Sequence, residues 1–113
     1  FTPEMGGQAR PWHVGVLWDK DEASARRLIE GLRAVEGLVV GDNEPYDGAL
    51  KGDTLYECGT QAGRAHILIE IRQDLISNAN GQRAWAERLA PMLAAINQNP
   101  QMHKRIAFGS RTD

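Results

Sequence analysis

The chain has 113 residues, of which 42% are apolar and 25% charged, the composition of one globular domain. Its formal net charge of −2 gives no basic footprint for nucleic acid, and no apolar run approaches the ~18 residues of a membrane span. The single cysteine, Cys58, excludes an internal disulfide and agrees with a reducing compartment. We therefore expect a cytoplasmic domain that binds neither nucleic acid nor membrane.

The sequence predicts a strand at 12–18 followed by a helix within 19–37. The strand is a short apolar run, and the helix carries apolar residues at helical spacing. Asp19 with Glu22 three residues on resembles a capping box, which sets the expected start of the helix. Gly37 is the expected stop.

The middle of the chain is expected to hold a second strand at 38–40 and then a long loop. Segment 41–54 is rich in Gly, Asn, Asp and Pro, a composition typical of a loop, and long loops in compact domains are often functional. Segment 54–63 could start a short helix with Asp53 or Thr54 as its cap.

The last third of the chain is expected to contain the clearest strand, at 66–71, and a helix over 80–98. Pro91 should kink or break that helix. The polar tail, about 98–113, is expected to be loosely held. The helix has an apolar stripe formed by Trp85, Leu89, Leu93 and Ile96.

This alternation of strands and helices predicts an α/β fold with a largely parallel sheet. In such sheets ligands bind beyond the carboxyl ends of the strands. The 41–54 loop and the pair Glu70 and Arg72 both follow strand ends, so we expect them at one edge of the sheet.

Glu70 is the first candidate for chemistry. Period-2 alternation puts Ile67, Ile69 and Ile71 on one face of the strand and leaves Glu70 and Arg72 on the other. A partly desolvated carboxylate at such a strand end could act as a general base. A structural ion pair between Glu70 and Arg72 is an equally good interpretation of the spacing alone.

The loop sequence DNEPYDG (42–48) is the second candidate. Tyr46 could reach over a ligand and donate a hydrogen bond from its hydroxyl. Composition alone favours a solvated turn in which Asp42 and Asn43 make local backbone hydrogen bonds.

The remaining reactive residue types carry no motif. His13, His66 and His103 lack metal-ligand spacing and are interpreted as packed, satisfied side chains. Cys58 has no motif partner and is interpreted as a buried or idle thiol. The sequence contains no GxGxxG, P-loop, GxSxG or CxxC pattern.

Three blocks, FTP…ARPWHVGVLWD, VVGDNEPYDG and IEIRQDLI, together resemble the C-terminal half of the N-formylglutamate amidohydrolase (deformylase) family, from Phe1 to about Ile96. The resemblance implies a mixed, largely parallel sheet flanked by helices, in a carboxypeptidase-like (phosphorylase/hydrolase-like) fold. It also implies a zinc-dependent hydrolase that converts N-formyl-L-glutamate to formate and glutamate in histidine degradation.

Carried over residue by residue, the resemblance implies that Glu70 is the general base and that Tyr46 covers the substrate. Arg72 would orient Glu70 or bind a substrate carboxylate through a bidentate contact. Asn43 and Arg10 are further candidates for substrate contacts.

In the family a His-Ser pair precedes the Phe-Thr-Pro segment, and its histidine resembles a zinc ligand. The resemblance therefore implies that residues 1–113 are the C-terminal portion of one amidohydrolase domain, with every zinc ligand upstream of Phe1. We expect this chain alone to bind no zinc at the family site, to be inactive, and to self-associate through an exposed sheet edge.

Two alternatives stay open. The chain could be a non-catalytic α/β domain that binds a small acidic ligand or a partner chain. It could also belong to an amidohydrolase for another N-acyl amino acid.

Overall fold

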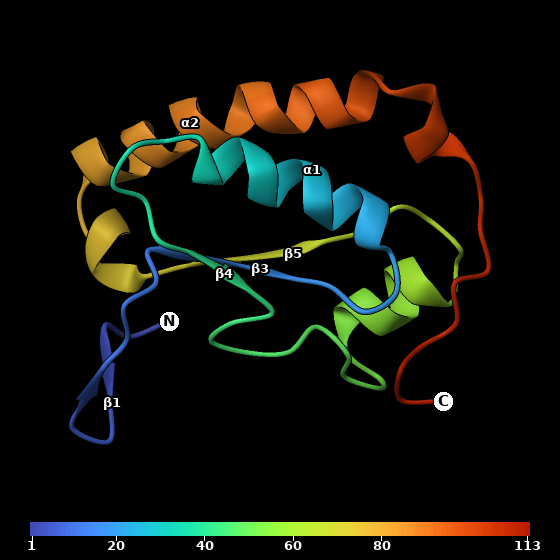
Figure 1. The fold of residues 1–113 in the computed structure, drawn as a ribbon, viewed down its shortest axis with the longest axis horizontal. Helices are drawn as coiled ribbons and strands as arrows, with labels where there is room; N and C mark the ends of the chain where they lie inside the picture. Colours follow the sequence, from blue (N-terminus) through green and yellow to red (C-terminus); the bar gives the residue numbers. More distant parts are fainter.

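Three short strands form the central sheet of the computed structural model, which describes residues 1–113 (Figure 1). Strands β3 (Val14–Leu17), β4 (Val40–Asp42) and β5 (Leu68–Ile71) lie in the order β4-β3-β5. β4 is parallel to β3, with Gly41 opposite Gly15. β5 is antiparallel to β3, with Glu70 opposite Gly15. The sheet is therefore mixed.

Both long helices cover the same face of this sheet (Figure 1). α1 (Glu22–Arg33) and α2 (Ala79–Gln98) pack over a core that includes alternate residues of the strands. The predicted apolar face of the third strand is confirmed, because its isoleucines pack against this core. The contributing side chains are Val14, Val16, Val40, Ile67, Ile69 and Ile71 from the sheet region and Ala25, Leu28, Ile29, Leu32 and Trp85 from the helices.

The direction of β5 corrects the expectation of a largely parallel sheet. Because β5 runs opposite to β3, its carboxyl end at Ile71 lies beside the amino end of β3 at Val14. The 41–54 loop leaves the sheet from β4, beyond the position where Asp42 pairs with Val16. Glu70 and the start of that loop therefore do not share one edge, as they would if all strands were parallel.

The face without helices is shaped by a row of three paired residues, Gly41, Gly15 and Glu70. Residues directly opposite one another in a sheet point to the same side. A Cβ on either glycine would collide with the main-chain carbonyl of Glu44. The two glycines thus allow the loop after β4 to fold back across the sheet next to Glu70.

The helix caps differ in part from those predicted. α1 begins after Asp21, whose Oδ1 accepts a hydrogen bond from the backbone N–H of Ser24 at 3.3 Å, so Asp19 is not the cap. A π-helical turn, Tyr56–Thr60, occupies the predicted short helix. Asp53, one of the two predicted caps, accepts a hydrogen bond from the Tyr56 N–H at 2.7 Å.

A small hairpin precedes the sheet and protrudes from the body (Figure 1). Strands β1 (Glu4–Met5) and β2 (Gln8–Ala9) pair antiparallel around Gly6 and Gly7. Both glycines have positive φ, which is the requirement of a two-residue type I′ turn. The sequence analysis did not predict this hairpin.

α2 continues through Pro91, so the predicted break is wrong, and the alternative of a kink stays a prediction. Trp85 is buried and Leu89 packs against the core, but Leu93 is 38% exposed. Ile96 also packs against the core, so the predicted stripe is confirmed except at Leu93. None of the helices is both long and apolar enough to cross a membrane.

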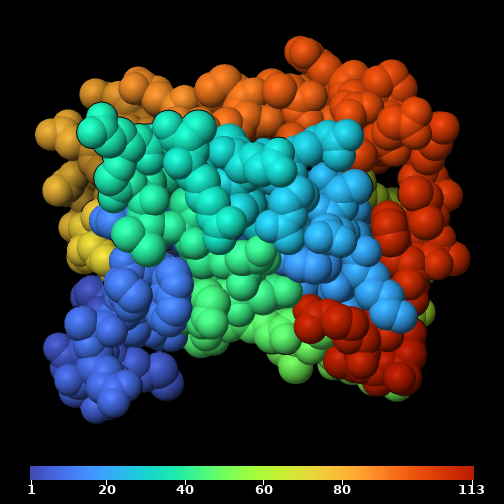
Figure 2. All heavy atoms as spheres, in the orientation of Figure 1, coloured from blue at the N-terminus to red at the C-terminus, as the bar shows by residue number.

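The tail is held in place, which corrects the expectation of a loose end. It includes a 3₁₀ turn, Pro100–His103, and the N–H of Ile106 donates to the carbonyl of Gly63 at 2.9 Å. Ser110 is buried, and Arg111 binds Asp19 at the end of the first predicted strand. Figure 2 shows the last residues seated against the segment that leads into α1.

We expect Gly15→Ala to destabilise the fold by about 1–3 kcal/mol, because the new methyl group would displace the Glu44 carbonyl and meet Pro45 Cδ at 3.2 Å. Urea unfolding would measure the change in free energy. Gly31→Ala is the matched control, since a methyl group there meets only Met92 at ordinary contact distance, 3.4 Å, within α1. That control should be neutral or stabilising. Equal stability of both variants would contradict the close approach.

Candidate active site

Glu70 lies on the helix-free face with its side chain 34% exposed. Its Oε2 is 3.9 Å from the main-chain nitrogen of Phe1. That nitrogen donates to the carbonyl of Ile71 at 3.0 Å, and the N–H of Gln73 donates to the carbonyl of Phe1 at 2.7 Å. Phe1 is thus fixed along the outer edge of β5. No arginine or lysine side chain pairs with the Glu70 carboxylate, so its oxygens remain available as proton acceptors.

The loop after β4 brings Tyr46 over this face. Asn43, at the start of the loop, adopts a left-handed conformation with φ of 52°. Its Oδ1 accepts hydrogen bonds from the N–H groups of Trp18 at 2.8 Å and Gly48 at 3.1 Å. Tyr46 follows a cis Glu44–Pro45 peptide and is 42% exposed. The bond from Gly48 is the local backbone hydrogen bond that composition favoured for Asn43. The same prediction is wrong for Asp42, which binds the side chains of Trp18 and Arg26.

Arg10 is held between two aromatic rings. Its guanidinium carbon lies 5.2 Å from the ring centroid of Phe1 and 5.1 Å from that of Tyr46. Nη1 donates to Thr2 Oγ1 at 3.1 Å and to its carbonyl at 3.3 Å. Arg10 is only 9% exposed and forms no ion pair. A nearly buried guanidinium without a carboxylate partner is costly, and its Nε and Nη2 donors have no protein acceptor.

Arg72 does not contact Glu70. Its Nε and Nη2 bind the two carboxylate oxygens of Asp74 at 2.7 and 3.1 Å, and Nη1 donates to the carbonyl of Trp12 at 3.4 Å. The hydrogen bond from Arg72 lowers the pKa of Asp74. The proposed structural ion pair between Glu70 and Arg72 is therefore wrong, since the fork of Arg72 is already occupied.

The histidines confirm their interpretation as satisfied side chains. His13 Nδ1 accepts from the N–H of Val39 at 2.9 Å, and His66 Nε2 lies 3.1 Å from Thr60 Oγ1. His103 Nε2 contacts the carbonyl of Asn97. Cys58 is exposed, which corrects the buried alternative. No three His, Cys, Asp or Glu side chains lie together in a way that could hold a metal ion.

A carboxylate network fastens the end of β4 to α1. Asp42 accepts from Trp18 Nε1 at 2.6 Å and from Arg26 Nη1 at 3.0 Å. Partial burial raises the pKa of Asp42, but these hydrogen bonds, together with the charges of Arg26 and Arg33, outweigh burial and lower the pKa. The start of the loop is therefore anchored from the helix side as well.

Sequence reasoning missed Arg111, which ties the tail to the Tyr46 loop. Its Nη1 and Nη2 bind the carboxylate of Asp47 at 3.0 and 2.6 Å. Nε and Nη2 also donate to the carbonyls of Asp19 and Trp18 at 3.0 and 2.8 Å. No local pattern links Arg111 to a loop so distant along the chain. Gly15 and Gly41 were also missed, although glycine within a strand is a known sign of close backbone approach.

Fold and site together define a mixed α/β protein in which a carboxylate and a guanidinium, each without a side-chain partner of opposite charge, lie beside an aromatic loop. Residues 1–77 match the family described as N-formylglutamate amidohydrolase, and the chain belongs to that family.

A solved structure is similar over most of the chain. The crystal structure of gene product Atu2144 from Agrobacterium tumefaciens superposes with a TM-score of 0.72 at 32% sequence identity. The match covers 87% of this chain and 40% of that one, so the chain spans less than half of that protein. A comparison with curated proteins finds no match.

We expect Arg111→Ala to loosen the Tyr46 loop and to change how stability depends on pH. The hydrogen bond from Arg111 lowers the pKa of Asp47 below its value in the unfolded chain. This ion pair therefore stabilises the fold fully above about pH 4, and the stabilisation is lost as the pH falls through the lowered folded value. Because both side chains are well exposed, at 41% and 57%, the pair should contribute only about 1 kcal/mol.

Urea unfolding between pH 7 and pH 3 would measure this effect. The stability gap between wild type and Arg111→Ala should narrow below pH 4. Arg83→Ala, which removes an exposed arginine from α2 that forms no ion pair, is the charge-matched control. A gap that stays constant down to pH 3 would show that the Asp47 pair does not contribute.

Proposed function

We propose that this chain forms part of an amidohydrolase that cleaves N-formyl-L-glutamate into formate and L-glutamate. Membership of the N-formylglutamate amidohydrolase family supports a hydrolase acting on an amide bond. Because the chain spans only 40% of its solved relative, the activity is assigned to a longer protein that contains these residues. We further propose a carboxypeptidase-like fold for that protein, a cytoplasmic location and a role in histidine degradation.

One observation carries this proposal: Glu70 and Arg10 both lie against Phe1, and neither has a side-chain partner of opposite charge. A partly buried carboxylate and a nearly buried guanidinium are ordinarily each paired with a side chain of opposite charge. The Glu70 carboxylate can therefore act as a base, and the Arg10 guanidinium can bind an anion. A substrate with an amide and carboxylates requires both.

Glu70 is proposed as the general base. Its carboxylate takes a proton from a water molecule as the water oxygen bonds to the formyl carbon. The same proton then passes to the glutamate nitrogen as the carbon–nitrogen bond breaks, which releases formate and the free amine. The lack of a hydrogen bond to the carboxylate from any side chain supports this role, since its oxygens are unoccupied.

Arg10 is proposed to bind a substrate carboxylate with Nε and Nη2, its two unused donor atoms. Tyr46 stacks on the same guanidinium and is proposed to cover the substrate. Arg72 and Asn43 remain proposed substrate contacts. Arg72 would have to exchange its bond to Asp74, and Asn43 would use its amide nitrogen, because its oxygen already accepts two hydrogen bonds.

Zinc is the proposed cofactor of the longer protein, but residues 1–113 do not fit a zinc centre. They contain no cluster of three possible ligands, and all three histidines are engaged elsewhere. The ligands are therefore proposed to lie upstream of Phe1. The position of the Phe1 nitrogen, 3.9 Å from Glu70, would bring preceding residues toward the base.

A second candidate is a non-catalytic domain that binds a small acidic ligand or a partner chain. The buried, unpaired Arg10 and the absence of a metal cluster favour it. Hydrolysis of another N-acyl amino acid is a variant of the first proposal.

We expect Glu70→Gln, made in a protein that also carries the upstream half, to reduce formate release from N-formylglutamate by about 10²–10⁴-fold, since the amide cannot accept the water proton. Glu57→Gln, on the exposed side of the π-helical turn, should leave the rate unchanged. Residues 1–113 alone should release no formate. A Glu70→Gln rate near that of wild type would remove Glu70 from the mechanism and favour the binding alternative.

We also propose self-association of residues 1–113 through the sheet. β4 and β5 are the two edge strands, and only the end of β5 is covered, by Phe1. Uncovered edges pair with other chains. Sedimentation should show a concentration-dependent dimer, and a monomer at high concentration would contradict this expectation.

A further inference from the structure

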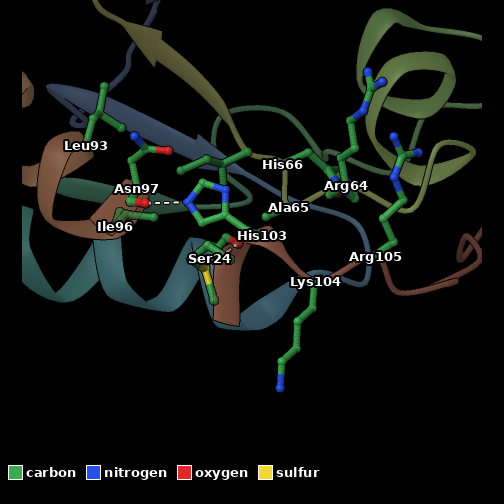
Figure 3. Close-up of a pocket in the computed structure, with 12 residues that line it drawn as sticks. Ser24, Arg64, Ala65, His66, Leu93, Ile96, Asn97, His103, Lys104 and Arg105 are labelled. Atoms are coloured by element: carbon green, nitrogen blue, oxygen red, sulfur yellow. Dashed lines mark hydrogen bonds between the residues drawn. The ribbon is translucent and has the colours of Figure 1, made fainter. Parts of the chain in front are cut away.

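A groove of about 660 Å³ lies at the end of β5 away from Glu70 (Figure 3). It is enclosed by segment 64–67, by the last turns of α2 and by the 3₁₀ turn Pro100–His103. Because Leu68 begins β5 and Ile71 ends it, this groove and the candidate active site flank opposite ends of one strand. Its apolar lining consists of Ala65, Ile67, Leu93, Ile96 and Met102.

The charged lining of the groove has one sign. Arg64, Lys104 and Arg105 line it, with His66 and His103, and no carboxylate does. None of the three cations forms an ion pair. The chain as a whole carries a net charge of −2, so this is a local concentration of positive charge and not a property of the composition.

Hydrogen bonds from the tail to the carbonyls of Ala62 and Gly63 hold Arg105 against the segment that precedes Arg64. The N–H of Ile106 donates to the carbonyl of Gly63 at 2.9 Å, and Arg105 Nη1 donates to the carbonyl of Ala62 at 2.8 Å. Figure 3 shows Arg64 and Arg105 extending to the same side, while Lys104 points away from them. The guanidinium of Arg64 makes no hydrogen bond, and Arg105 keeps Nε and Nη2 free.

The buried carboxylate of Asp21 does not neutralise this pair. Asp21 is 2% exposed and binds two residues that line the groove, His66 and Ser24. It accepts from the N–H of His66 at 2.9 Å and from the hydroxyl of Ser24 at 2.7 Å, so its oxygens are already satisfied. The two guanidinium groups therefore line the groove without a counter-ion from the protein.

We propose that this groove binds a small phosphate-bearing molecule. The free donors of Arg64 and Arg105 match the oxygens of a phosphate group, which arginine binds through forked, charge-assisted hydrogen bonds. The apolar lining receives the uncharged part of the ligand, and Lys104 adds only long-range attraction. This site is separate from Glu70 and Arg10 and does not depend on the proposed amidohydrolase activity.

Isothermal titration of the chain with pyrophosphate at constant ionic strength tests the proposal. Saturable binding is expected, and Arg64→Ala and Arg105→Ala should each weaken it by about tenfold or more, the effect of losing charge-assisted hydrogen bonds. Arg83→Ala removes the same charge from the exposed face of α2 and should leave affinity unchanged. Arg64→Lys keeps the charge without the fork and should give intermediate affinity.

Thermal unfolding of each variant separates lost binding from lost structure. Because the side chain of Arg64 makes no hydrogen bond in the fold, the Arg64 variants should have the melting temperature of the wild type. The proposal would be overturned if pyrophosphate did not bind saturably, or if Arg64→Ala and Arg83→Ala lowered the affinity for pyrophosphate equally. Binding to phosphatidylglycerol vesicles without binding to pyrophosphate would also overturn it.

Discussion

The helix-free face depends on one close contact, in which the main-chain carbonyl of Glu44 packs directly against Gly15 and Gly41. The Glu44 carbonyl occupies the space where side chains at Gly15 and Gly41 would lie. Because these glycines pair in one row with Glu70, the loop crosses the sheet beside the carboxylate. Its course brings Tyr46 onto Arg10. A side chain on either glycine would push the loop away from the sheet.

This close approach is held by polar anchors at both ends of the loop. Asn43 turns the chain after β4 with a left-handed backbone, and its side chain binds the backbone of Trp18 and Gly48. Arg111 binds Asp47 from the other end of the sequence. The tail is therefore part of the architecture of the candidate site. Loss of either anchor should loosen the aromatic cover over Arg10 more than it disturbs the helix-packed core.

The spacing of apolar residues correctly predicted the features that depend on local sequence, namely the two faces of the third strand and the two long helices. It assigned the isoleucines of segment 66–71 to the core and Glu70 to the opposite face, and it placed both long helices. The direction of β5 could not be predicted this way, because strand direction depends on where the connection through the π-helical turn returns to the sheet. The sequence also could not show that Asp21 caps α1, because Asp19 has the same carboxylate two residues earlier. In the structure Asp19 instead accepts a hydrogen bond from the distant Arg111.

Residue spacing alone did not decide whether Arg72 binds Glu70, and in the structure Arg72 binds the nearer carboxylate of Asp74 instead. Alternation puts Arg72 on the side of Glu70, but a 3₁₀ turn begins directly after it and presents Asp74 two residues on. A bidentate contact with so near a neighbour restricts few bonds of the chain, so it is favoured over a contact along the strand. Had Arg72 bound Glu70 instead, the carboxylate oxygens would be occupied by guanidinium donors and poorly placed to accept a proton. The Asp74 pair thus leaves Glu70 without a side-chain partner, which is the property that a general base on this face requires.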